Sequence, residues 1–508
     1  MVIIGKLLKK GTEISYRRNA NNSKEYIKQL KTLKKLLFTS KNTEFGFFHS
    51  FNNILSRPDL VKSFQQQVPV MDYDAFYKQW LKKSLEGQAN INWPGKIKYF
   101  ALSSGTTGSP SKRIPVTEGM IRSFQKTSIR QLATLHEIDL PEAFFSSQFL
   151  TVGGSSRLTK KSNHIEGDLS GILKKHTSLL ATPFTKPGYR ISNIKDWNKK
   201  IDLIVQKAPK WNIGIIAGIP SWCILLMERI INHYNLNNIH DIWPNLQVYV
   251  HGGVFMGPYK EKLEKLCSKK VHLLDTYLAS EGYFAYQTSS SSIGMKLLLD
   301  TGIFYEFIPF NSDYFDQHGQ VINSKKALTL SQVKEGIDYA LVITTNAGLW
   351  RYLIGDLVRF VNITERELII TGRIKQFLSL CGEHLSLENI NEAIINLSKK
   401  EKIDIIEFTI FADEINQCHH WFISSNEPIN SEVSEKMDKE LCSLNDDYAS
   451  ARKYTLGAPK ISVLNKSVFY GFLNSMGKQG GQNKFPRVLN KTQAKKWLKF
   501  IGTSKNSS

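Results

Sequence analysis

Residues 97–112 read IKYFALSSGTTGSPSK, and this stretch decides the fold class. Its first six residues are typical of a strand, and they run into a loop of serine, threonine and glycine that ends in Lys112. Such a loop offers backbone N–H groups, hydroxyl donors and one cation, which are the groups that bind a polyphosphate. The spacing of Gly105 and Gly108, with Arg113 following Lys112, excludes a Walker A loop. Taken alone, the segment is more often a surface turn.

The segments on either side of this stretch predict an α/β or α+β protein. Residues 1–95 are typical of helices and end at the breaker Trp93-Pro94-Gly95. The middle of the chain mixes a helical segment, 259–267, with strand-like runs at 246–250, 297–299, 303–308 and 340–344. Residues 368–370 predict a strand, followed by a turn at Gly372-Arg373 and by a helix capped by Ser386. We therefore place a domain boundary at 372–378.

Composition narrows the class of protein. The chain has 508 residues, of which 41% are hydrophobic and 22% charged, and these values exclude collagen-like and mostly disordered proteins. No apolar run reaches the roughly 20 residues of a membrane span, and the N-terminus does not resemble a signal peptide. Five widely spaced cysteines without a C-x-x-C pair predict neither a disulfide framework nor a zinc site. Cys418-His419-His420 lies in a predicted strand and is given a structural role. We expect a soluble, cytoplasmic protein.

The net charge of +22 suggests a polyanionic partner, but its distribution argues for caution. Residues 1–36 carry ten Lys or Arg against two acids, and residues 481–508 carry seven against none. The first of these segments predicts an amphipathic helix with Lys24, Lys28, Lys31 and Lys35 opposite Tyr26, Leu30, Leu33 and Leu37. A docked helix with a solvated basic face is the favoured interpretation. Contact with an anionic membrane or a polyanion is the alternative.

Four further motifs carry candidate chemistry. Thr276 to Gly282, downstream of His251-Gly252-Gly253, places one carboxylate, Glu281, among small residues, which suits Mg²⁺, and Tyr277 could stack on a base. Gly348 to Asp356 ends in an aspartate that can accept both hydroxyls of a ribose, and we expect it on a loop leaving a strand. The segments 371–375 and 482–487 are basic turns. Each motif alone has a structural explanation, such as a buried tyrosine or a turn aspartate.

The order of the motifs is more specific than any one of them. A hydroxyl-glycine loop, Tyr-x-x-Ser-Glu, Tyr-x-x-Gly-Asp, Gly-Arg-x-Lys and a C-terminal lysine together resemble the acyl-adenylate-forming superfamily that includes firefly luciferase. The chain is most similar to the plant auxin-responsive acyl acid amido synthetases and their bacterial relatives. The resemblance covers most of the chain and includes VPV at 68–70 before Tyr73, AGIPSW at 217–222, FYEFIP at 304–309 and KFPR at 484–487.

The resemblance implies an ATP-dependent ligase. A carboxylate attacks the α-phosphorus of ATP to give an acyl-adenylate and pyrophosphate, and an amine, typically of an amino acid, then displaces AMP. The implied fold is a large N-terminal adenylate-forming domain, 1–371, with α/β layers and a β-barrel-like portion. A hinge at 372–378 and a small, mobile α+β C-terminal domain at 379–508 follow. ATP and Mg²⁺ are the implied cofactors. A monomer that acts on a small carboxylic acid and an amino acid, without nucleic acid, is expected.

The resemblance also assigns residues. Ser103, Ser104, Thr106, Thr107 and the catalytic Lys112 belong to the phosphate loop. Gly252, Gly253 and Tyr277 line the adenine and acyl-adenylate site, Ser280 touches the α-phosphate and Glu281 holds Mg²⁺. Asp356 binds the ribose with Tyr352 beside it, and Lys375 is the hinge. Lys484 reaches the α-phosphate from the C-terminal domain, with Lys478 as a less favoured candidate. The acyl pocket draws on the early helices and on Trp222, Glu306 and Phe307.

Two departures from the family pattern stand out. Plant members commonly have Tyr-Arg before the Gly-Asp pair, whereas here Tyr352 is followed by Leu353, so that the role of the arginine passes to Arg351 or is absent. Trp350 stands where a tyrosine is usual. An adenylating enzyme with another acceptor, such as coenzyme A, is an alternative. A basic membrane- or nucleic-acid-binding protein with a vestigial site is another.

Overall fold

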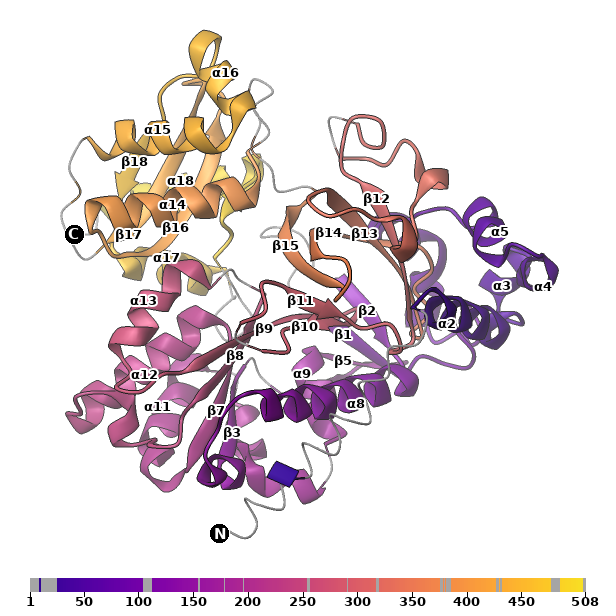
Figure 1. Cartoon of the computed structure of the whole chain (residues 1–508), viewed down its shortest axis with the longest axis horizontal. Helices are drawn as coiled ribbons and strands as arrows, with labels where there is room; N and C mark the ends of the chain where they lie inside the picture. The colour runs from indigo at the N-terminus through magenta and orange to yellow at the C-terminus, as the bar shows by residue number, and fades with distance from the viewer. Residues whose placement is uncertain are drawn as a thin grey trace. The chain divides into compact units, whose positions relative to one another are not determined.

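The computed structural model describes most of the chain, namely residues 9–10, 25–103, 112–153, 156–177, 179–194, 196–253, 256–289, 291–316, 319–374, 378, 380, 385–425, 429, 432–476 and 485–505. These residues divide into two compact units. The described parts of Met1–Ser103, Ser111–Val254 and Leu266–Ile370 form the first unit. Those of Phe255–Lys265 and Thr371–Ser508 form the second. Figure 1 labels the helices and strands of both units.

Short helices precede the first strand, as the sequence predicts. They are α2 (Glu25–Ser40), α3 (Glu44–Phe48), α4 (Phe51–Ser56), α5 (Leu60–Gln67), α6 (Tyr73–Phe76) and α7 (Lys82–Leu85). The side chains of Thr43, Asp59 and Asp72 cap three of them by accepting a backbone N–H. Two details of the prediction are wrong. Residues 86–98 are irregular, and Tyr26 is 46% exposed instead of lying on the buried face of α2 with Leu33 and Leu37.

One long sheet organises the first unit, and half of it is parallel. The parallel strands are β6 (Thr185–Lys186), β3 (Gln148–Val152), β7 (Ile213–Gly218), β8 (Val248–Gly252) and β9 (His272–Ala279), in that order. β7 is a continuous apolar run with little exposure, as expected for a parallel strand covered on both faces. Helix α12 (Pro220–Tyr234) packs on β7, and α11 (Trp197–Lys207) packs on α12.

The other half of the sheet is antiparallel and continues from β9. Its strands are β10 (Gly282–Tyr286), β11 (Met295–Leu297), β15 (Glu367–Arg373), β14 (Tyr352–Asn362), β13 (Asp338–Thr345) and β12 (Ile303–Pro309). Their buried side chains share one core with the N-terminal helices. Helix α8 (Glu118–Thr134) packs on β10. The sheet therefore changes from parallel to antiparallel at β9, next to the segment that carries Glu281.

A smaller sheet holds the stretch from which the sequence analysis began. It contains β2 (Lys112–Val116), β1 (Tyr99–Ser103), β5 (Ile165–Gly167) and β4 (Thr159–Lys160), and α9 (Leu169–Lys175) packs on β1. β1 and β2 are antiparallel, and Ser103 is the register partner of Lys112. The predicted strand before the hydroxyl-glycine loop is confirmed, and its two described ends lie side by side.

The second unit is an α+β structure around a four-stranded sheet. The strand order is β18 (Lys460–Val463), β17 (Cys418–Ser425), β16 (Ile405–Asp413) and β19 (Val488–Leu489). Its helices are α13 (Gly257–Lys265), α14 (Leu387–Glu401), α15 (Val433–Leu444), α16 (Asp446–Tyr454), α17 (Lys466–Ser475) and α18 (Lys491–Lys505). Ser386 caps α14, as predicted, by accepting the N–H of Asn389. The inclusion of α13, which comes from the middle of the chain, was not predicted.

Two predicted loops are wrong. Asp356 lies inside β14 and not on a loop that leaves a strand, and Gly372-Arg373 continues β15 and does not form a turn. In both places, pairing with neighbouring strands provides backbone partners and overrides the local preference of glycine for turns. None of the helices in the described ranges is long and apolar enough to cross a membrane.

The Cys418-His419-His420 segment has the predicted structural role. The three residues begin β17, where Cys418 and His419 are buried. The His420 ring lies against Phe422 and exchanges a hydrogen bond of 2.9 Å with the Ser462 hydroxyl. Cys418 is a free thiol.

Candidate active site

The carboxyl ends of four parallel strands define the edge at which the candidate residues gather. β3, β7, β8 and β9 run in one direction, so that they end on the same side of the sheet, which is where ligands bind in open α/β sheets. β8 ends at Gly252, and β9 is followed by Ser280 and Glu281. The structure therefore brings Gly252, Gly253, Ser280 and Glu281 to one edge.

Gly252 is required by the close approach of two strands. A Cβ atom at this position would lie 2.4 Å from the backbone oxygen of Thr276 on β9. Gly253 follows with a φ of +75°, a conformation that glycine adopts without strain. The Thr276 hydroxyl closes the same contact by donating to the His251 carbonyl at 2.8 Å. The glycines thus let the end of β8 lie against the strand that carries Tyr277.

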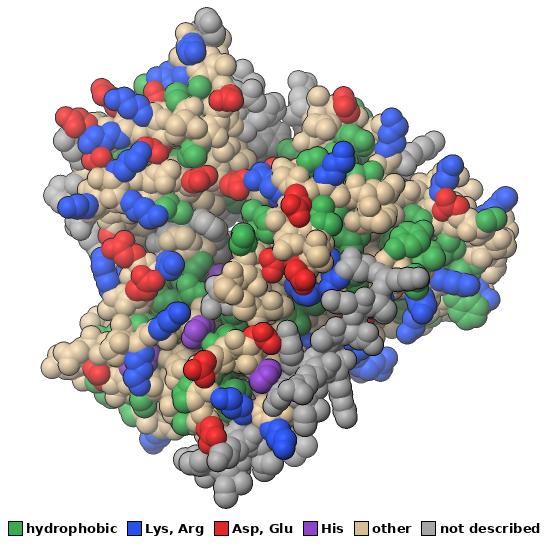
Figure 2. Space-filling model, viewed as in Figure 1, with side chains coloured by type: hydrophobic (Ala, Val, Ile, Leu, Met, Phe, Trp, Pro, Cys, Tyr) green, Lys and Arg blue, Asp and Glu red, His purple; other side chains and the backbone are tan. Residues whose placement is uncertain are grey.

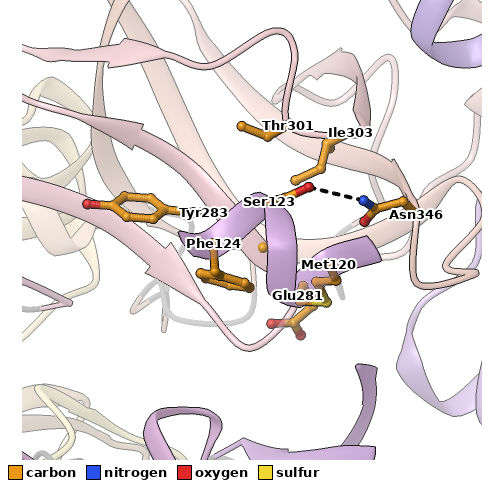
Figure 3. A pocket seen from close by; sticks show the side chains of 9 residues that line it. Met120, Ser123, Phe124, Glu281, Tyr283, Thr301, Ile303 and Asn346 are labelled. Carbon is orange, nitrogen blue, oxygen red and sulfur yellow. Dashed lines mark hydrogen bonds between the residues drawn. The ribbon is translucent and has the colours of Figure 1, made fainter. Parts of the chain in front are cut away.

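Glu281 is a buried carboxylate that lines a small hollow. Its side chain is 6% exposed and lies between the end of β9 and the start of β10. Met120 and Ser123 of α8, and Asn346 after β13, line the same hollow (Figure 3). The Asn346 amide donates to the Ser123 hydroxyl at 3.2 Å. The sequence analysis did not single out Asn346, although it lies two residues before the Gly348 motif.

Two predicted nucleotide-site residues are bonded to each other. The hydroxyl of Tyr277, on β9, donates to Oδ2 of Asp356, on β14, at 2.6 Å. Both side chains are buried, and the Tyr277 ring packs edge-on against Phe284 with centroids 4.8 Å apart. This contact spans the antiparallel part of the sheet and orients the Asp356 carboxylate.

Tyr352 presents a polar atom that has no partner among the described residues. Its ring is fully buried, and its hydroxyl makes no hydrogen bond. Burial raises the pKa of this phenol well above its usual value, and the negative charges of Glu281, Asp72 and Asp356 raise it further. The hydroxyl therefore stays protonated, and an unpaired buried donor beside carboxylates is typical of a site completed by a ligand.

Lys112 reaches this cluster through Tyr73. The Lys112 ammonium lies 5.3 Å from the centre of the Tyr73 ring, and the Tyr73 hydroxyl accepts the backbone N–H of Arg113 at 2.8 Å. Met71, two residues earlier, pairs with Tyr352 through the N–H of Leu353. The VPV motif at 68–70 thus leads to Asp72 and Tyr73 beside Tyr352. The sequence analysis missed Asp72, which its capping pattern before α6 could have indicated.

Several assigned residues lie outside the described residues. They are Ser104, Thr106 and Thr107 of the phosphate loop, the hinge Lys375, and both C-terminal candidates, Lys484 and Lys478. The structure does describe Arg487 of the same KFPR motif. Its guanidinium donates to Glu407 at 2.7 Å and to the Phe408 carbonyl at 2.9 Å, and it contacts the Tyr259 hydroxyl. Arg487 therefore fixes the chain three residues after Lys484 within the second unit.

The three acyl-pocket candidates are packed against the protein itself. Trp222 lies edge-on to Trp197 at 4.7 Å, and Phe307 packs on Phe360 at 5.2 Å. Glu306 is 1% exposed and pairs with Arg351 at 2.9 Å. A carboxylate held in this way serves the fold, and the position of the acyl pocket stays a prediction.

Arg351 does not replace the family arginine. Its side chain is fully buried, and beyond Glu306 it donates to three backbone carbonyls, those of Gln65, Val68 and Ser324. These bonds use the guanidinium inside the protein and fasten α5 to the start of β14. Trp350 beside it packs among the N-terminal aromatic residues, face to face with Phe45 at 5.6 Å.

The donor set at this edge suits a magnesium ion bound together with phosphate. No group of three or more His, Cys, Asp or Glu gathers to hold a metal in the part of the chain that the structure describes. Mg²⁺ commonly uses one or two protein carboxylates and takes its other oxygens from phosphate and water. Glu281, buried beside the unpaired Tyr352 hydroxyl, fits that arrangement.

Family profiles match most of the chain. The profile described as the GH3 family N-terminal domain matches residues 20–143 and 126–272. The GH3 family central domain matches 296–368, and the GH3 family C-terminal domain matches 388–493. The three matches follow one another in the order of the family.

Similar proteins cover nearly the whole chain. A jasmonoyl–L-amino acid synthetase of Nicotiana attenuata, JAR6, is 23% identical over 91% of this chain and 90% of the relative. The indole-3-acetic acid-amido synthetase GH3.4 of Arabidopsis thaliana is 24% identical over 92% and 90%. The solved structure of the GH3.15 acyl acid amido synthetase superposes with a TM-score of 0.76 at 17% identity, over 94% of this chain and 93% of that one. A 2-hydroxyisobutyryl-CoA ligase has a TM-score of 0.60 at 13% identity, over 94% and 92%.

Proposed function

The chain belongs to the GH3 family, and we propose that it is an ATP-dependent ligase that joins a carboxylic acid to an amine through an acyl-adenylate. The resemblance inferred from the motifs is confirmed, and so is the adenylate-forming fold class. The relatives named above are amido synthetases, and an amino acid is the acceptor that we propose. AMP and pyrophosphate are the other products. The coenzyme A alternative is not favoured.

One observation of this structure carries the proposal. The unpaired hydroxyl of Tyr352 lies beside Glu281 and Asp356, at the end of the sheet where the glycines of β8 also lie. Asp356 is preoriented by Tyr277 to accept the ribose hydroxyls, and Tyr352 supplies a donor that stays protonated. Donors fixed before the substrate arrives are effective because they need no reorganisation during the reaction.

The reaction needs charge neutralisation and exclusion of water more than covalent help from the protein. When the carboxylate oxygen attacks the α-phosphorus, charge builds on the phosphate oxygens and on the departing pyrophosphate. Lys112 lies at the mouth of the β1–β2 hairpin, from which it would contact the phosphates, and Lys484 would contact the α-phosphate. Mg²⁺, which we propose Glu281 holds, would neutralise further charge. A buried site protects the mixed anhydride from hydrolysis until the amine attacks.

A product assay tests this proposal. Purified protein is incubated with ATP, Mg²⁺, a panel of aryl and aliphatic acids and pooled amino acids, and the products are weighed by mass spectrometry. We expect AMP and a new amide. Glu281→Ala is expected to abolish both, whereas Glu118→Ala, at an exposed glutamate of α8, should retain them. A thioester formed only when coenzyme A is added would overturn the amide assignment, and failure of ATP to bind would overturn the enzyme.

A further inference from the structure

Helix α2 has two faces of opposite character, and the outer one is unusual. Leu33, Leu36, Leu37 and Ser40 follow the spacing of one helical face, and all are buried in the first unit. Lys31, Lys34, Lys35 and Phe38 follow the same spacing on another face, and all four are exposed. The Phe38 side chain is 62% exposed at the end of this lysine row. The helix is therefore docked, as predicted, and its basic face ends in an exposed aromatic ring.

The next helix adds two more exposed rings close by. In α3, Phe47 is 65% exposed and Phe48 is 72% exposed. The helix lies tightly against the end of α2, because a Cβ atom on Gly46 would come within 2.2 Å of the Ser40 carbonyl oxygen. Three exposed phenylalanines thus occur within residues 38–48, although large apolar side chains in water are normally scattered singly. We call Phe38, Phe47, Phe48 and the lysines around them the Phe-Lys patch.

Cations surround these rings at short range. The Lys41 ammonium lies 4.3 Å from the centre of the Phe38 ring. Phe48 packs edge-on against the buried Trp80, and the ammonium of Lys83 lies 5.9 Å from the Trp80 ring. Residues 26–43 contain five lysines and no acid. The nearest acid along the chain, Glu44, is paired with Lys83. Figure 2 shows green side chains bordered by blue ones over this part of the molecule.

We propose that the Phe-Lys patch binds the surface of an anionic lipid membrane, independently of the ligase chemistry. Exposed aromatic rings enter the interfacial layer of a bilayer, and lysines around them are attracted to anionic headgroups. The two contributions are both needed, because single surface charges are screened by salt and exposed rings alone lack selectivity for charged lipid. The apolar face of α2 stays in the core, so binding requires no unfolding of the helix.

Binding to vesicles tests the proposal directly. The full-length protein is sedimented with vesicles of phosphatidylcholine alone or with added phosphatidylserine, at low and at physiological salt. We expect binding to the serine-containing vesicles, weakening as salt rises, and at least tenfold less binding to neutral ones. Equal binding to both, or none to either at physiological salt, would overturn the proposal.

Matched variants locate the surface. Lys34→Gln with Lys35→Gln on α2 is compared with Lys495→Gln with Lys496→Gln, an adjacent exposed lysine pair on α18. We expect about a tenfold loss of affinity from the first pair only, since each lysine near the surface contributes about 1 kcal/mol. Phe38→Ser with Phe47→Ser should act likewise, and Phe184→Ser, at a 45% exposed ring elsewhere, should not. Equal losses from both lysine pairs would show that general charge, and not this patch, binds lipid.

Two further measurements keep the outcome decisive. Acid-dependent AMP release of each variant should equal that of the parent, because no patch residue belongs to the candidate active site. Sedimentation equilibrium detects the competing occupant, a second copy of this chain. A dimer that is lost in the phenylalanine variant, together with no vesicle binding, would overturn the proposal in favour of self-association.

Discussion

At the scale of single residues, the bond between Tyr277 and Asp356 is a direct target. Tyr277→Phe removes the hydroxyl that donates to Asp356 at 2.6 Å but retains the ring packed on Phe284. A hydrogen bond to a charged group contributes about 1.5–3 kcal/mol, so we expect the KM for ATP to rise by about tenfold or more. Steady-state kinetics at saturating acid and amine measure it. An unchanged KM would show that Asp356 does not need this orientation.

His251 gives the first unit a pH-dependent stability. Burial lowers the pKa of this imidazole to about 4, although its Nδ1 lies 3.4 Å from Asp275. Because the unfolded chain binds the proton more tightly, with an ordinary pKa of about 6.5, stability is full above pH 6.5 and is lost as the pH falls toward 4. We expect His251→Asn to remove about 3 kcal/mol of that pH dependence. Urea unfolding at several pH values measures this, with the exposed His233→Asn as the control that should change nothing.

The residue scale also shows where sequence reasoning stops. The types and order of Tyr277, Glu281 and Asp356 predicted a nucleotide site, and the structure places the three around Tyr352. Glu306 was assigned to a substrate pocket because it is a carboxylate among aromatic residues. Its partner, Arg351, is 45 residues further along the chain, and such a pairing leaves no local signal in the sequence.

At the scale of elements, the start of β14 depends on one buried ion pair. Arg351 and Glu306 are 0% and 1% exposed, and breaking such a pair by removing one partner costs about 3–5 kcal/mol. We expect Arg351→Met to lower the free energy of unfolding by that amount. Arg359→Met, on the same strand with a 28% exposed side chain bound to Asp338, should cost about 1 kcal/mol or less. Similar losses from both variants, in denaturant titrations, would contradict this difference.

The predicted elements that proved correct have strong local signals. The strand before Ser103 and the capped helix after Ser386 follow from a β-rich run and a capping serine. The two errors, at Asp356 and at Gly372-Arg373, lie beside glycines that suggested turns. In each case a neighbouring strand, distant in sequence, supplies the pairing that makes the segment a strand. Such pairing is decided by the whole sheet and not by the segment.

At the scale of the whole molecule, the second unit depends on residues far apart in the chain. Arg487 donates to Glu407, and both meet Tyr259 of α13. Their side chains are nearly inaccessible, so we expect Arg487→Met to lower the stability of the second unit by about 3–5 kcal/mol. Lys491→Met, which removes an exposed pair with Glu414, is the matched control and should cost under about 1 kcal/mol. Hydrogen exchange of β16 and β19 measures the difference, and equal protection in both variants would contradict it.

The family and its fold could be predicted because five short motifs keep their order along the chain. The division into units could be predicted only in part, because α13 lies in sequence between two strands of the first unit but packs with the second. No local pattern marks such a segment. The acid, the amine and the hinge at Lys375 remain predictions for experiments on the protein.

The path of one oxygen atom tests the central claim most directly. The acid found in the product assay is prepared with ¹⁸O in its carboxylate and is turned over with ATP and the amine. If the carboxylate attacks the α-phosphorus and the amine then displaces AMP, one labelled oxygen leaves with AMP, and AMP is heavier by one ¹⁸O. Label in inorganic phosphate, with ADP as the nucleotide product, would show attack at the γ-phosphorus and would contradict the adenylation mechanism.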